Sequence, residues 1–367
     1  MLKYALIGCG RIAHKHLQAA LALEKEGRLR IAALCDLSPQ AMEEKRGRYP
    51  LSHAACYTDY REMVEEVQPD LVAVATESGS HGEIALHCME KKCCVMVEKP
   101  MALSLSQAKE MAQQAKRQGV LLTVCHQNRF NPAVQKLRQA VEQGLFGRIF
   151  YGSAAVRWHR DKKYYTQAPW RGTWERDGGA LMNQCIHNID LLQWMLGGEP
   201  VGAMAMTDQL AHPYIQGEDM GLGILKFQGG YGLLEGTTNI YPQNLEETLC
   251  IFGEKGTVKL GGAAVNEIQH WQFAQGESWE QARQHSQFPA DIYGSGHQAL
   301  YRDMVRAMGQ GSTPYITGEE GIKALEIVLA LYQSAAEGRM VHLPLLQGAT
   351  ADYTGRFEPA RRDGWAL

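Results

Sequence analysis

A glycine-rich segment near the N-terminus constrains this chain more than any other feature. Residues Gly8 to Ala13 read G-x-G-x-x-A and lie between an apolar run and a helix-like stretch. In this pattern Gly8 permits a tight turn, Gly10 lets the backbone approach a pyrophosphate, and Ala13 lets the helix pack close to the sheet. The N-terminus of the helix favours the same anion. The next apolar run ends at Asp36, where a carboxylate can accept the ribose hydroxyls of a dinucleotide. The segment therefore predicts a dinucleotide site, and the alternative is a glycine-rich turn without a ligand.

The first third of the chain alternates short apolar runs with polar-rich, helix-like stretches. Strands are predicted at residues 3–9, 29–35, 70–76, 93–97 and 121–125, and helices at 14–26, 39–48, 60–67, 81–91 and 104–118. The runs are apolar throughout and do not alternate, which indicates parallel strands covered on both faces. Strands that alternate with helices imply right-handed crossovers and a doubly wound sheet.

From about residue 124 the pattern changes. Strands are predicted at residues 150–158, 203–208, 222–227, 232–238, 248–252 and 257–260. Several of them alternate polar and apolar residues, as expected for an antiparallel sheet with one covered face. A chain of 367 residues is also too long for a single core. The predicted fold class is α/β, with an N-terminal Rossmann doubly wound parallel sheet (residues 1–123), a C-terminal α+β domain with a largely antiparallel open sheet (124–346), and a tail (347–367).

Charge and composition exclude several classes of function. The formal net charge is −3, so no basic footprint for nucleic acid is present. No apolar run approaches the roughly 20 residues that a membrane span needs, and the N-terminus lacks the layout of a signal peptide. The nine cysteines contain no C-x-x-C pair with metal-site spacing. We expect a soluble, cytoplasmic protein with reduced thiols, no metal, no nucleic acid and no membrane partner.

After the fourth predicted strand the chain reads Glu98-Lys99-Pro100. Together with the glycine turn, this motif resembles the Gfo/Idh/MocA family of sugar and inositol dehydrogenases. The resemblance continues at residues 76–81, 128–130, 251–257 and 314–344, and so extends over most of the chain. In that family the lysine of this motif lies beside the nicotinamide and the substrate hydroxyl, which implies the same place for Lys99, with Glu98 as its neighbour.

The resemblance and the glycine turn together define a set of expected cofactor-binding residues. They are Gly8, Gly10, Arg11, Ile12, Asp36, Thr76, Ser78, His81, Glu98 and Lys99. Asp36 favours NAD over NADP, because its carboxylate would repel a 2′-phosphate; Arg11 and the basic residues of the second helix weaken that preference. Glu77 replaces the proline that is usual in the family.

A helix predicted to follow Gly178-Gly179 carries the most informative part of the second domain. Helical spacing places Asn183, His187 and Asp190 together, opposite an apolar stripe. Without the resemblance this would indicate an amphipathic helix that shows its polar side to water. Family members carry D-x-x-x-H here, so His187 matches the acid/base histidine and Asn183 stands where Asp is usual.

The resemblance implies that Lys99 and His187 act as a pair on the proton of an alcohol. Oxidation of an alcohol needs a hydride acceptor and a base. His187 has a suitable ordinary pKa, and a positively charged nicotinamide would lower that of Lys99. Asn183 cannot ionise, but it can hydrogen-bond a substrate hydroxyl or the ribose. Which of the two residues removes the proton stays open.

Residues 157–174, between the first predicted strand of the second domain and the helix of Asn183, contain aromatic residues interleaved with arginines. Rings pack on sugar faces and guanidinium groups bind carboxylate or phosphate; the alternative is a surface loop with buried tryptophan anchors. The candidate substrate-binding residues are Arg157, Tyr165, Trp170, Arg171, Asn183 and His187. The segment is similar to family members that oxidise UDP-N-acetylglucosaminuronate.

The expected function is therefore an NAD-dependent dehydrogenase of a sugar or nucleotide-linked sugar. A free sugar or inositol dehydrogenase is the first alternative, and a non-catalytic dinucleotide-binding regulatory protein is the second. A third is an enzyme that retains its cofactor, or one that works as a reductase. The open sheet face predicts a homodimer or homotetramer.

Overall fold

The computed structural model describes residues 1–288, 294 and 296–358. The chain divides into two compact units, the first with residues 1–102, 106–127 and 297–322, and the second with residues 103–105, 128–296 and 323–367. The predicted boundary after residue 123 lies near the change of unit at 127/128. Residues 297–322 belong to the first unit, however, and not to the second domain to which the sequence assigned them. The predicted tail is part of the second unit, and its last nine residues, 359–367, lie outside the described residues.

The first unit contains a six-stranded sheet in the order β3-β2-β1-β4-β5-β6. Its strands are β1 (Leu2–Ile7), β2 (Leu29–Cys35), β3 (Ala55–Tyr57), β4 (Leu71–Val74), β5 (Cys94–Val97) and β6 (Leu122–Val124). Every pair is parallel. Five of these strands match the prediction, and β3 was missed. The order of strands reverses between β1 and β4, and ligands of such sheets bind at the carboxyl ends of the strands at that point.

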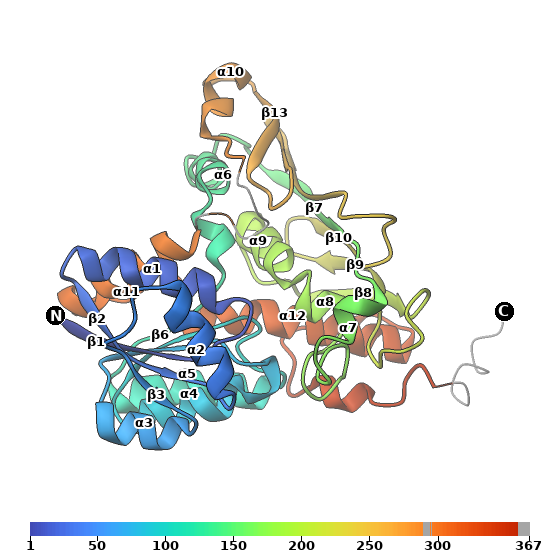
Figure 1. Ribbon diagram of the computed structural model, residues 1–367. Helices are drawn as coiled ribbons and strands as arrows, with labels where there is room; N and C mark the ends of the chain where they lie inside the picture. The colour runs from blue at the N-terminus through green and yellow to red at the C-terminus, as the bar shows by residue number, and fades with distance from the viewer. Residues whose placement is uncertain (289–293, 295, 359–367) are drawn as a thin grey trace. The chain divides into compact units, whose positions relative to one another are not determined.

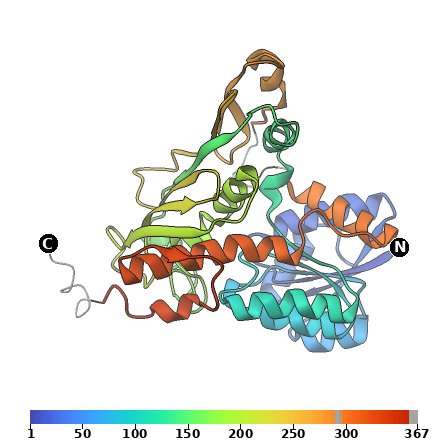
Figure 2. The same cartoon turned by 180° about the vertical axis from the view of Figure 1, so that it is seen from behind.

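Helices cover both faces of this sheet, as predicted. They are α1 (Ala13–Lys25), α2 (Pro39–Arg48), α3 (Tyr60–Val67), α4 (His81–Glu90), α5 (Leu105–Gln118) and α11 (Gly296–Gln310). Helices α1 and α11 lie on one face, and α3 and α4 lie on the other (Figures 1 and 2). The residues of β4 are fully buried between these layers, which explains its continuous apolar sequence.

The second unit is built on an eight-stranded sheet in the order β13-β12-β11-β7-β10-β9-β8-β14. Its strands are β7 (Ile149–Arg157), β8 (Gly202–Asp208), β9 (Met220–Lys226), β10 (Tyr231–Thr237), β11 (Glu246–Gly253), β12 (Gly256–Gly261), β13 (Glu267–Phe273) and β14 (Val341–His342). Only the pair of β10 and β7 is parallel, so the sheet is largely antiparallel, as predicted.

Helices cover one face of this second sheet. The helices of the unit are α6 (Pro132–Glu142), α7 (Lys162–Tyr165), α8 (Ala180–Asn183), α9 (Ile186–Leu196), α10 (Trp279–Ala282) and most of α12 (Gly318–Glu337). Helix α9 packs on β7, β10 and β11, and α8 packs on β9 and β10. Helix α9 ends with a left-handed C-cap at Gly197, whose φ is 74°.

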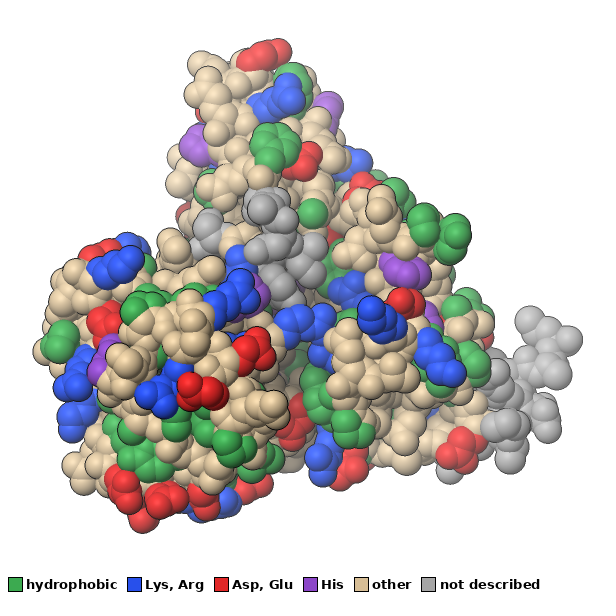
Figure 3. Space-filling view, viewed as in Figure 1, with side chains coloured by type: hydrophobic (Ala, Val, Ile, Leu, Met, Phe, Trp, Pro, Cys, Tyr) green, Lys and Arg blue, Asp and Glu red, His purple; other side chains and the backbone are tan. Residues whose placement is uncertain are grey.

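On the face shown in Figure 3, acidic and basic side chains are interspersed and do not form one basic surface. Within the described residues, none of the helices combines the length and the apolar composition that crossing a membrane requires.

Candidate active site

The glycine turn of the first unit has the geometry of a cradle for an anion. Gly8 has a φ of 97°, and a Cβ there would lie 2.4 Å from the carbonyl oxygen of Ala75, so only glycine fits. A Cβ on Gly10 would meet nothing within 4 Å, so the side of this residue is open. The N-cap Ile12 makes no side-chain cap to α1, and no acidic residue occupies the first turn of that helix. The open glycine and the uncapped helix end together fit a pyrophosphate.

Asp36 lies directly beside this turn, at the end of β2. Its carboxylate accepts hydrogen bonds from the backbone N–H of Cys9 (2.7 Å) and of Ser38 (2.8 Å). It is partly exposed, so it retains lone pairs for a ligand. Its position at the carboxyl edge of the sheet, next to the glycine turn, is the one required for a contact with ribose.

The loop after β4 mixes exposed and internal roles. Thr76 is partly exposed and its hydroxyl hydrogen-bonds to that of Ser80 (2.7 Å), whereas Ser78 is buried. His81 is also buried, and its ring nitrogens lie 2.8 Å from the carbonyl oxygen of Pro100 and 3.2 Å from that of Thr76. Burial lowers the pKa of His81. These contacts make His81 a tie between two loops, which differs from the cofactor contact that the sequence suggested.

Glu98 and Lys99 follow β5 at the same edge. Glu98 is only 6% exposed, and one of its oxygens contacts His16 (3.0 Å) and His297 (3.2 Å) while the other accepts the backbone N–H of Lys99 (3.2 Å). Glu98 is thus engaged inside the unit, and its predicted contact with the cofactor stays a prediction. Lys99 itself is partly exposed at the carboxyl end of β5, and Arg11 is exposed on the glycine turn.

In the second unit the predicted single helix is two helices, because long-range contacts fix its start. A Cβ on Gly179 would lie 1.4 Å from Glu218 Oε2, so the glycine is needed for close approach. Glu218 Oε1 accepts the N–H of Leu181 (2.8 Å) and the hydroxyl of Tyr332 (2.9 Å). Burial raises the pKa of Glu218 to about 8 in spite of these bonds. The contacts fix α8, and α9 then starts anew after Cys185.

Asn183 and His187 both lie partly exposed, at the end of α8 and in the first turn of α9. The Nδ2 of Asn183 donates to Asp177, and its Oδ1 accepts from Gln184. Asp177 is 2% exposed and also accepts the N–H of Gly172 (2.6 Å). A carboxylate therefore contacts position 183 from a neighbouring loop. The sequence missed Asp177, since its relation to Asn183 depends on the turn at Gly178.

Arginine and tyrosine side chains extend this polar group. Gln184 donates to the hydroxyl of Tyr164 (3.0 Å), and Arg171 donates to the same hydroxyl (2.7 Å). Arg160 donates to Gln184 Oε1 (2.8 Å). Arg171 also stacks on Trp170, with its guanidinium carbon 4.4 Å from the ring centroid. The structure thus brings the predicted Arg171 and Trp170 near Asn183, and adds Tyr164 and Arg160, which were not singled out.

Two predicted positions have other roles. Arg157 lies on β7 and pairs with Glu235 (2.5 Å) and Glu246 (2.6 Å), so its charge is already neutralised on the sheet. Tyr165 is 9% exposed and its hydroxyl meets that of Thr238 (3.3 Å), so it packs inside the unit. Neither contact set supports the substrate role expected from sequence. The strand register could have revealed the first, because Arg157 shares the solvent-facing side of β7 with Tyr151.

Asp190 also differs from the expectation. It was placed on a polar face with Asn183 and His187, but it is 1% exposed and forms a bidentate ion pair with the buried Arg129. Its role is to anchor α9.

Comparison with protein families identifies both parts of the chain. Residues 2–126 match the GFO_IDH_MocA model described as "Oxidoreductase family, NAD-binding Rossmann fold", and residues 138–343 match "Oxidoreductase family, C-terminal alpha/beta domain". The chain belongs to the Gfo/Idh/MocA family. The predicted family, fold and NAD-binding domain are confirmed.

Solved structures and curated proteins agree with this assignment. WlbA dehydrogenase from Bordetella pertussis, solved with NADH and UDP-GlcNAcA, is 35% identical with a TM-score of 0.85, over 94% of this chain and 98% of that chain. The WlbA protein from Chromobacterium violaceum, solved with the same two ligands, is 38% identical with a TM-score of 0.85, over 94% and 96% of the chains. D-apiose dehydrogenase of Paraburkholderia graminis is 26% identical, over 98% of this chain and 94% of the relative. The expectation of an oxidoreductase of the sugar dehydrogenase type is confirmed at the level of the family.

Proposed function

We propose that this protein oxidises a secondary alcohol of an anionic, nucleotide-linked sugar with NAD, and that UDP-GlcNAcA or a close analogue is its substrate. The observation that carries the choice of substrate is Arg160. Its guanidinium donates to three neutral acceptors, Gln184 Oε1, Asn244 Oδ1 (3.0 Å) and the carbonyl oxygen of His159 (2.7 Å). Among the described residues it forms no ion pair, and it lies two hydrogen bonds from Asn183. A positive charge without a carboxylate partner suits a substrate that brings its own anion.

The chemistry follows from the groups at the two edges. NAD, when bound, accepts the hydride. Lys99 and His187 take up the hydroxyl proton, since an alcohol is oxidised only when a base removes that proton. Asn183, fixed by Asp177 and Gln184, presents its amide to orient the hydroxyl or the ribose. Gly8, Gly10, Arg11, Ile12, Asp36 and Thr76 are the residues proposed to hold the cofactor.

Incubation with NAD and a panel of sugars tests the substrate. UDP-GlcNAcA is expected to produce NADH faster than uncharged free sugars or inositols. Arg160→Gln keeps the hydrogen-bonding shape in part but removes the charge, so it is expected to raise KM for UDP-GlcNAcA about tenfold, which is roughly 1.4 kcal/mol of lost binding. The matched control is Arg157→Gln, whose charge is already paired with Glu235 and Glu246. Equal KM changes in the two variants would contradict the role of Arg160.

The same panel separates the alternatives. Faster turnover of a free sugar or inositol would assign the protein to that class. Turnover without added NAD would indicate a retained cofactor, and tight NADH binding without turnover of any sugar would favour the regulatory protein.

Asp36 is proposed to select NAD over NADP. In the unmodified protein the dissociation constant of NADPH is expected to exceed that of NADH. Asp36→Ala is expected to reduce the ratio of these two constants about tenfold, because the variant loses both the repulsion of the 2′-phosphate and the contact with the ribose. NADH and NADPH fluorescence titrations measure both constants. Asp70→Ala is the control, because Asp70 also accepts a backbone N–H, that of Lys3 (2.7 Å), but at the opposite end of the sheet. An unchanged ratio in Asp36→Ala would overturn the assignment.

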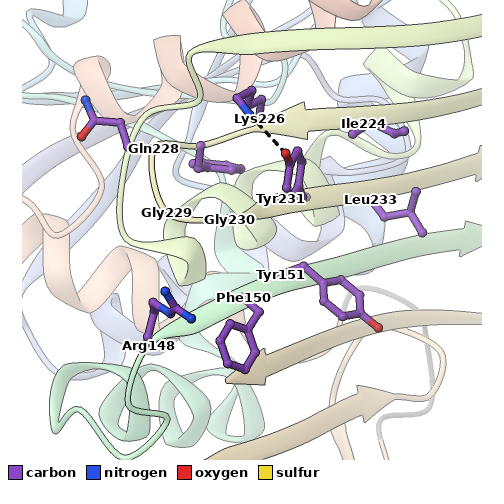
Figure 4. Close-up of a pocket in the computed structure, with 12 residues that line it drawn as sticks. Arg148, Phe150, Tyr151, Ile224, Lys226, Gln228, Gly229, Gly230, Tyr231 and Leu233 are labelled. Atoms are coloured by element: carbon purple, nitrogen blue, oxygen red, sulfur yellow. Dashed lines mark hydrogen bonds between the residues drawn. The ribbon is translucent and has the colours of Figure 1, made fainter. Parts of the chain in front are cut away.

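We also propose that the uncovered face of the second sheet binds a second copy of the chain, which gives the expected homodimer or homotetramer. Met204, Ile224 and Leu233 are directly paired across β8, β9 and β10 and are each about half exposed. Tyr151 and Tyr231 are paired with each other on β7 and β10, in the neighbouring row of the same face (Figure 4). Monomers rarely leave such a continuous apolar face exposed to water. Two copies of the chain related by a two-fold axis can pack these faces against each other and so bury both.

Sedimentation velocity tests this surface. The protein is expected to sediment as a dimer or tetramer, and Leu233→Glu is expected to shift it toward the monomer, because each copy then places a charge in the apolar contact. Leu346→Glu is the control, since Leu346 is 96% exposed and lies outside this sheet. If the Leu233→Glu protein has the same sedimentation coefficient as the unmodified protein, this face is not the contact surface between copies.

A cytoplasmic location is proposed as well. Its support is that the nine cysteines form no disulfide in the described part of the chain, as expected in a reducing compartment.

A further inference from the structure

A chain of buried polar side chains runs through the first unit to the residue before Lys99. Tyr4 on β1 and Tyr301 on α11 join their hydroxyls at 2.7 Å, and Tyr301 contacts His16 Nδ1 at 2.7 Å. His16 Nε2 and His297 Nε2 then meet the same oxygen of Glu98, at 3.0 and 3.2 Å. His16, Tyr4 and Tyr301 are fully buried, and His297 is 2% exposed. So many polar groups inside a sheet core are costly unless each one is paired.

One assignment of the protons pairs all of these groups except His297 Nδ1, for which the described residues supply no partner. Tyr4 donates to Tyr301, and Tyr301 donates to Nδ1 of His16. Both histidines then donate from Nε2 to Glu98. Burial lowers the pKa of His297, which is consistent with a neutral ring that donates from one nitrogen. Burial alone would raise the pKa of Glu98, but the hydrogen bonds from His16 and His297 outweigh it and hold that pKa well below its usual range. The result is a buried carboxylate held by two histidine donors, with the thiol of Cys125 as a further hydrogen-bond partner.

The second oxygen of this carboxylate accepts the backbone N–H of Lys99 at 3.2 Å. The position of the Lys99 backbone therefore depends on two helices, α1 through His16 and α11 through His297. On the far side of the turn, His81 holds the carbonyl oxygen of Pro100. The segment from Glu98 to Pro100 is thus fixed from both ends, because the backbone N–H of Glu98 also donates to the carbonyl oxygen of Val74 (2.9 Å).

We propose that His16 and His297 are positioning residues for Lys99: by holding the Glu98 carboxylate they set the place of the Lys99 backbone, and so of its amine at the carboxyl edge of the sheet. This inference rests on the proposed function, in which Lys99 handles the substrate proton. The proposal gives a role to α11, with which the chain returns to the first unit after residues 128–296 of the second.

The same three side chains have the spacing of a metal site, because one ligand atom from each lies within 4.8 Å of the others. Hydrogen bonds explain the distances without an ion. Glu98 Oε2 is engaged by Lys99, and the ring of His16 is already tied to Tyr301 through its other nitrogen. A metal site and a hydrogen-bonded cluster differ in one measurable quantity, the metal content of the purified protein.

The test compares two replacements of His297. His297→Leu removes the donor to Glu98, whereas the amide of His297→Gln can reach the same oxygen with an N–H. His297→Leu is expected to slow NADH formation from UDP-GlcNAcA in a single turnover by roughly 10²-fold, the cost of misplacing a catalytic group by about 1 Å. His297→Gln is expected to restore most of that rate. The dissociation constant of NADH, measured by fluorescence, is expected to stay nearly unchanged in both.

Thr123→Val is the matched control. It removes another buried hydrogen bond of the same unit, from the Thr123 hydroxyl to the carbonyl oxygen of Ile316 (2.6 Å), without touching Glu98. Its single-turnover rate is expected to equal that of the unmodified protein. If His297→Leu does not fold, Tyr301→Phe replaces it, since it removes the hydroxyl that fixes His16 and is expected to slow the same step severalfold.

A double-mutant cycle separates this inference from the proposed function. If Lys99→Ala alone keeps full turnover, the catalytic role proposed for Lys99 is wrong. If the unmodified protein forms no NADH from UDP-GlcNAcA, the proposed function is wrong. If Lys99→Ala is slow and His297→Leu slows it no further, the two residues act as one unit, as proposed. Four results would each overturn the inference. The first two are rate losses of Lys99→Ala and His297→Leu that add up independently, and a His297→Gln variant that does not restore the rate. The other two are a rate loss in Thr123→Val equal to that in His297→Leu, and a purified protein with close to one equivalent of bound transition metal.

Discussion

Lys99→Ala and His187→Ala are each expected to lower the rate of NADH formation from UDP-GlcNAcA by roughly 10²- to 10⁴-fold, the usual contribution of a general acid or base. Lys99 follows β5 at the carboxyl edge of the first sheet, and His187 lies in the first turn of α9 in the second unit. Both are partly exposed, so each can reach a ligand. Steady-state and single-turnover kinetics, with NADH absorbance as the signal, measure the loss.

Two controls make the result specific. Lys92→Ala removes an exposed lysine of the same unit, whose amine donates to the carbonyl oxygen of Gln118 (3.0 Å), and it is expected to leave the rate unchanged. NADH affinity is expected to fall little in His187→Ala, because the proposed cofactor cradle lies in the first unit. Normal turnover by either alanine variant would remove that residue from the assignment.

The pair is also expected to be non-additive. If both residues serve one proton transfer, the double variant loses little more than the slower single variant, because the second replacement removes a group that no longer acts. This outcome would support the paired role, and it would leave open which residue is the final base. A pH–rate profile of the unmodified protein then addresses that question.

The first unit could be predicted from sequence because its signals are local. Helix α2 has its predicted bounds, since Ser38 caps it by accepting the N–H of Ala41 and Pro39 opens it. Strand β2 has its predicted bounds for a similar reason, an apolar run that ends at Asp36. Strand β3 was missed because it is largely exposed and only three residues long, too short to show a period. The return of α11 was missed because nothing local marks the unit to which a helix belongs.

In the second unit, long-range contacts decided what local patterns could not. The helical period continues through Gln184 and Cys185, but Glu218 and Tyr332, which are distant in the sequence, fix α8 so that the helix is interrupted there. The partner of Asn183 is hidden in the same way, since Asp177 reaches it only through the turn at Gly178. The motif singled out Asn183 and His187 as candidates, but the partner of Asn183 required the fold.

The pair of Arg129 and Asp190 gives the largest expected effect on stability. The two side chains are joined by bonds of 2.8 and 2.6 Å and are each 1% exposed. Asp190→Asn removes the carboxylate from a guanidinium that water cannot reach, and such a loss typically costs about 3–5 kcal/mol of unfolding free energy. Chemical denaturation measures this change. Because Asp190 lies one turn after His187 on α9, turnover is also expected to fall while NADH binding remains.

A compensating variant distinguishes a buried charge from a general loss of packing. Arg129→Met combined with Asp190→Leu removes both charges and is expected to recover much of the stability, since a buried ion pair contributes less than its parts suggest. Lys91→Ala is the control, because the Lys91 and Glu65 pair (2.9 Å) is exposed and such a pair is worth only about 0.2–1 kcal/mol. If the unfolding free energy of Asp190→Asn lies within about 1 kcal/mol of that of the unmodified protein, the ion pair contributes no more than a surface pair, and the expected effect is wrong. If the double variant regains stability but not turnover, the ion pair serves to orient α9, and with it His187, beyond holding the unit together.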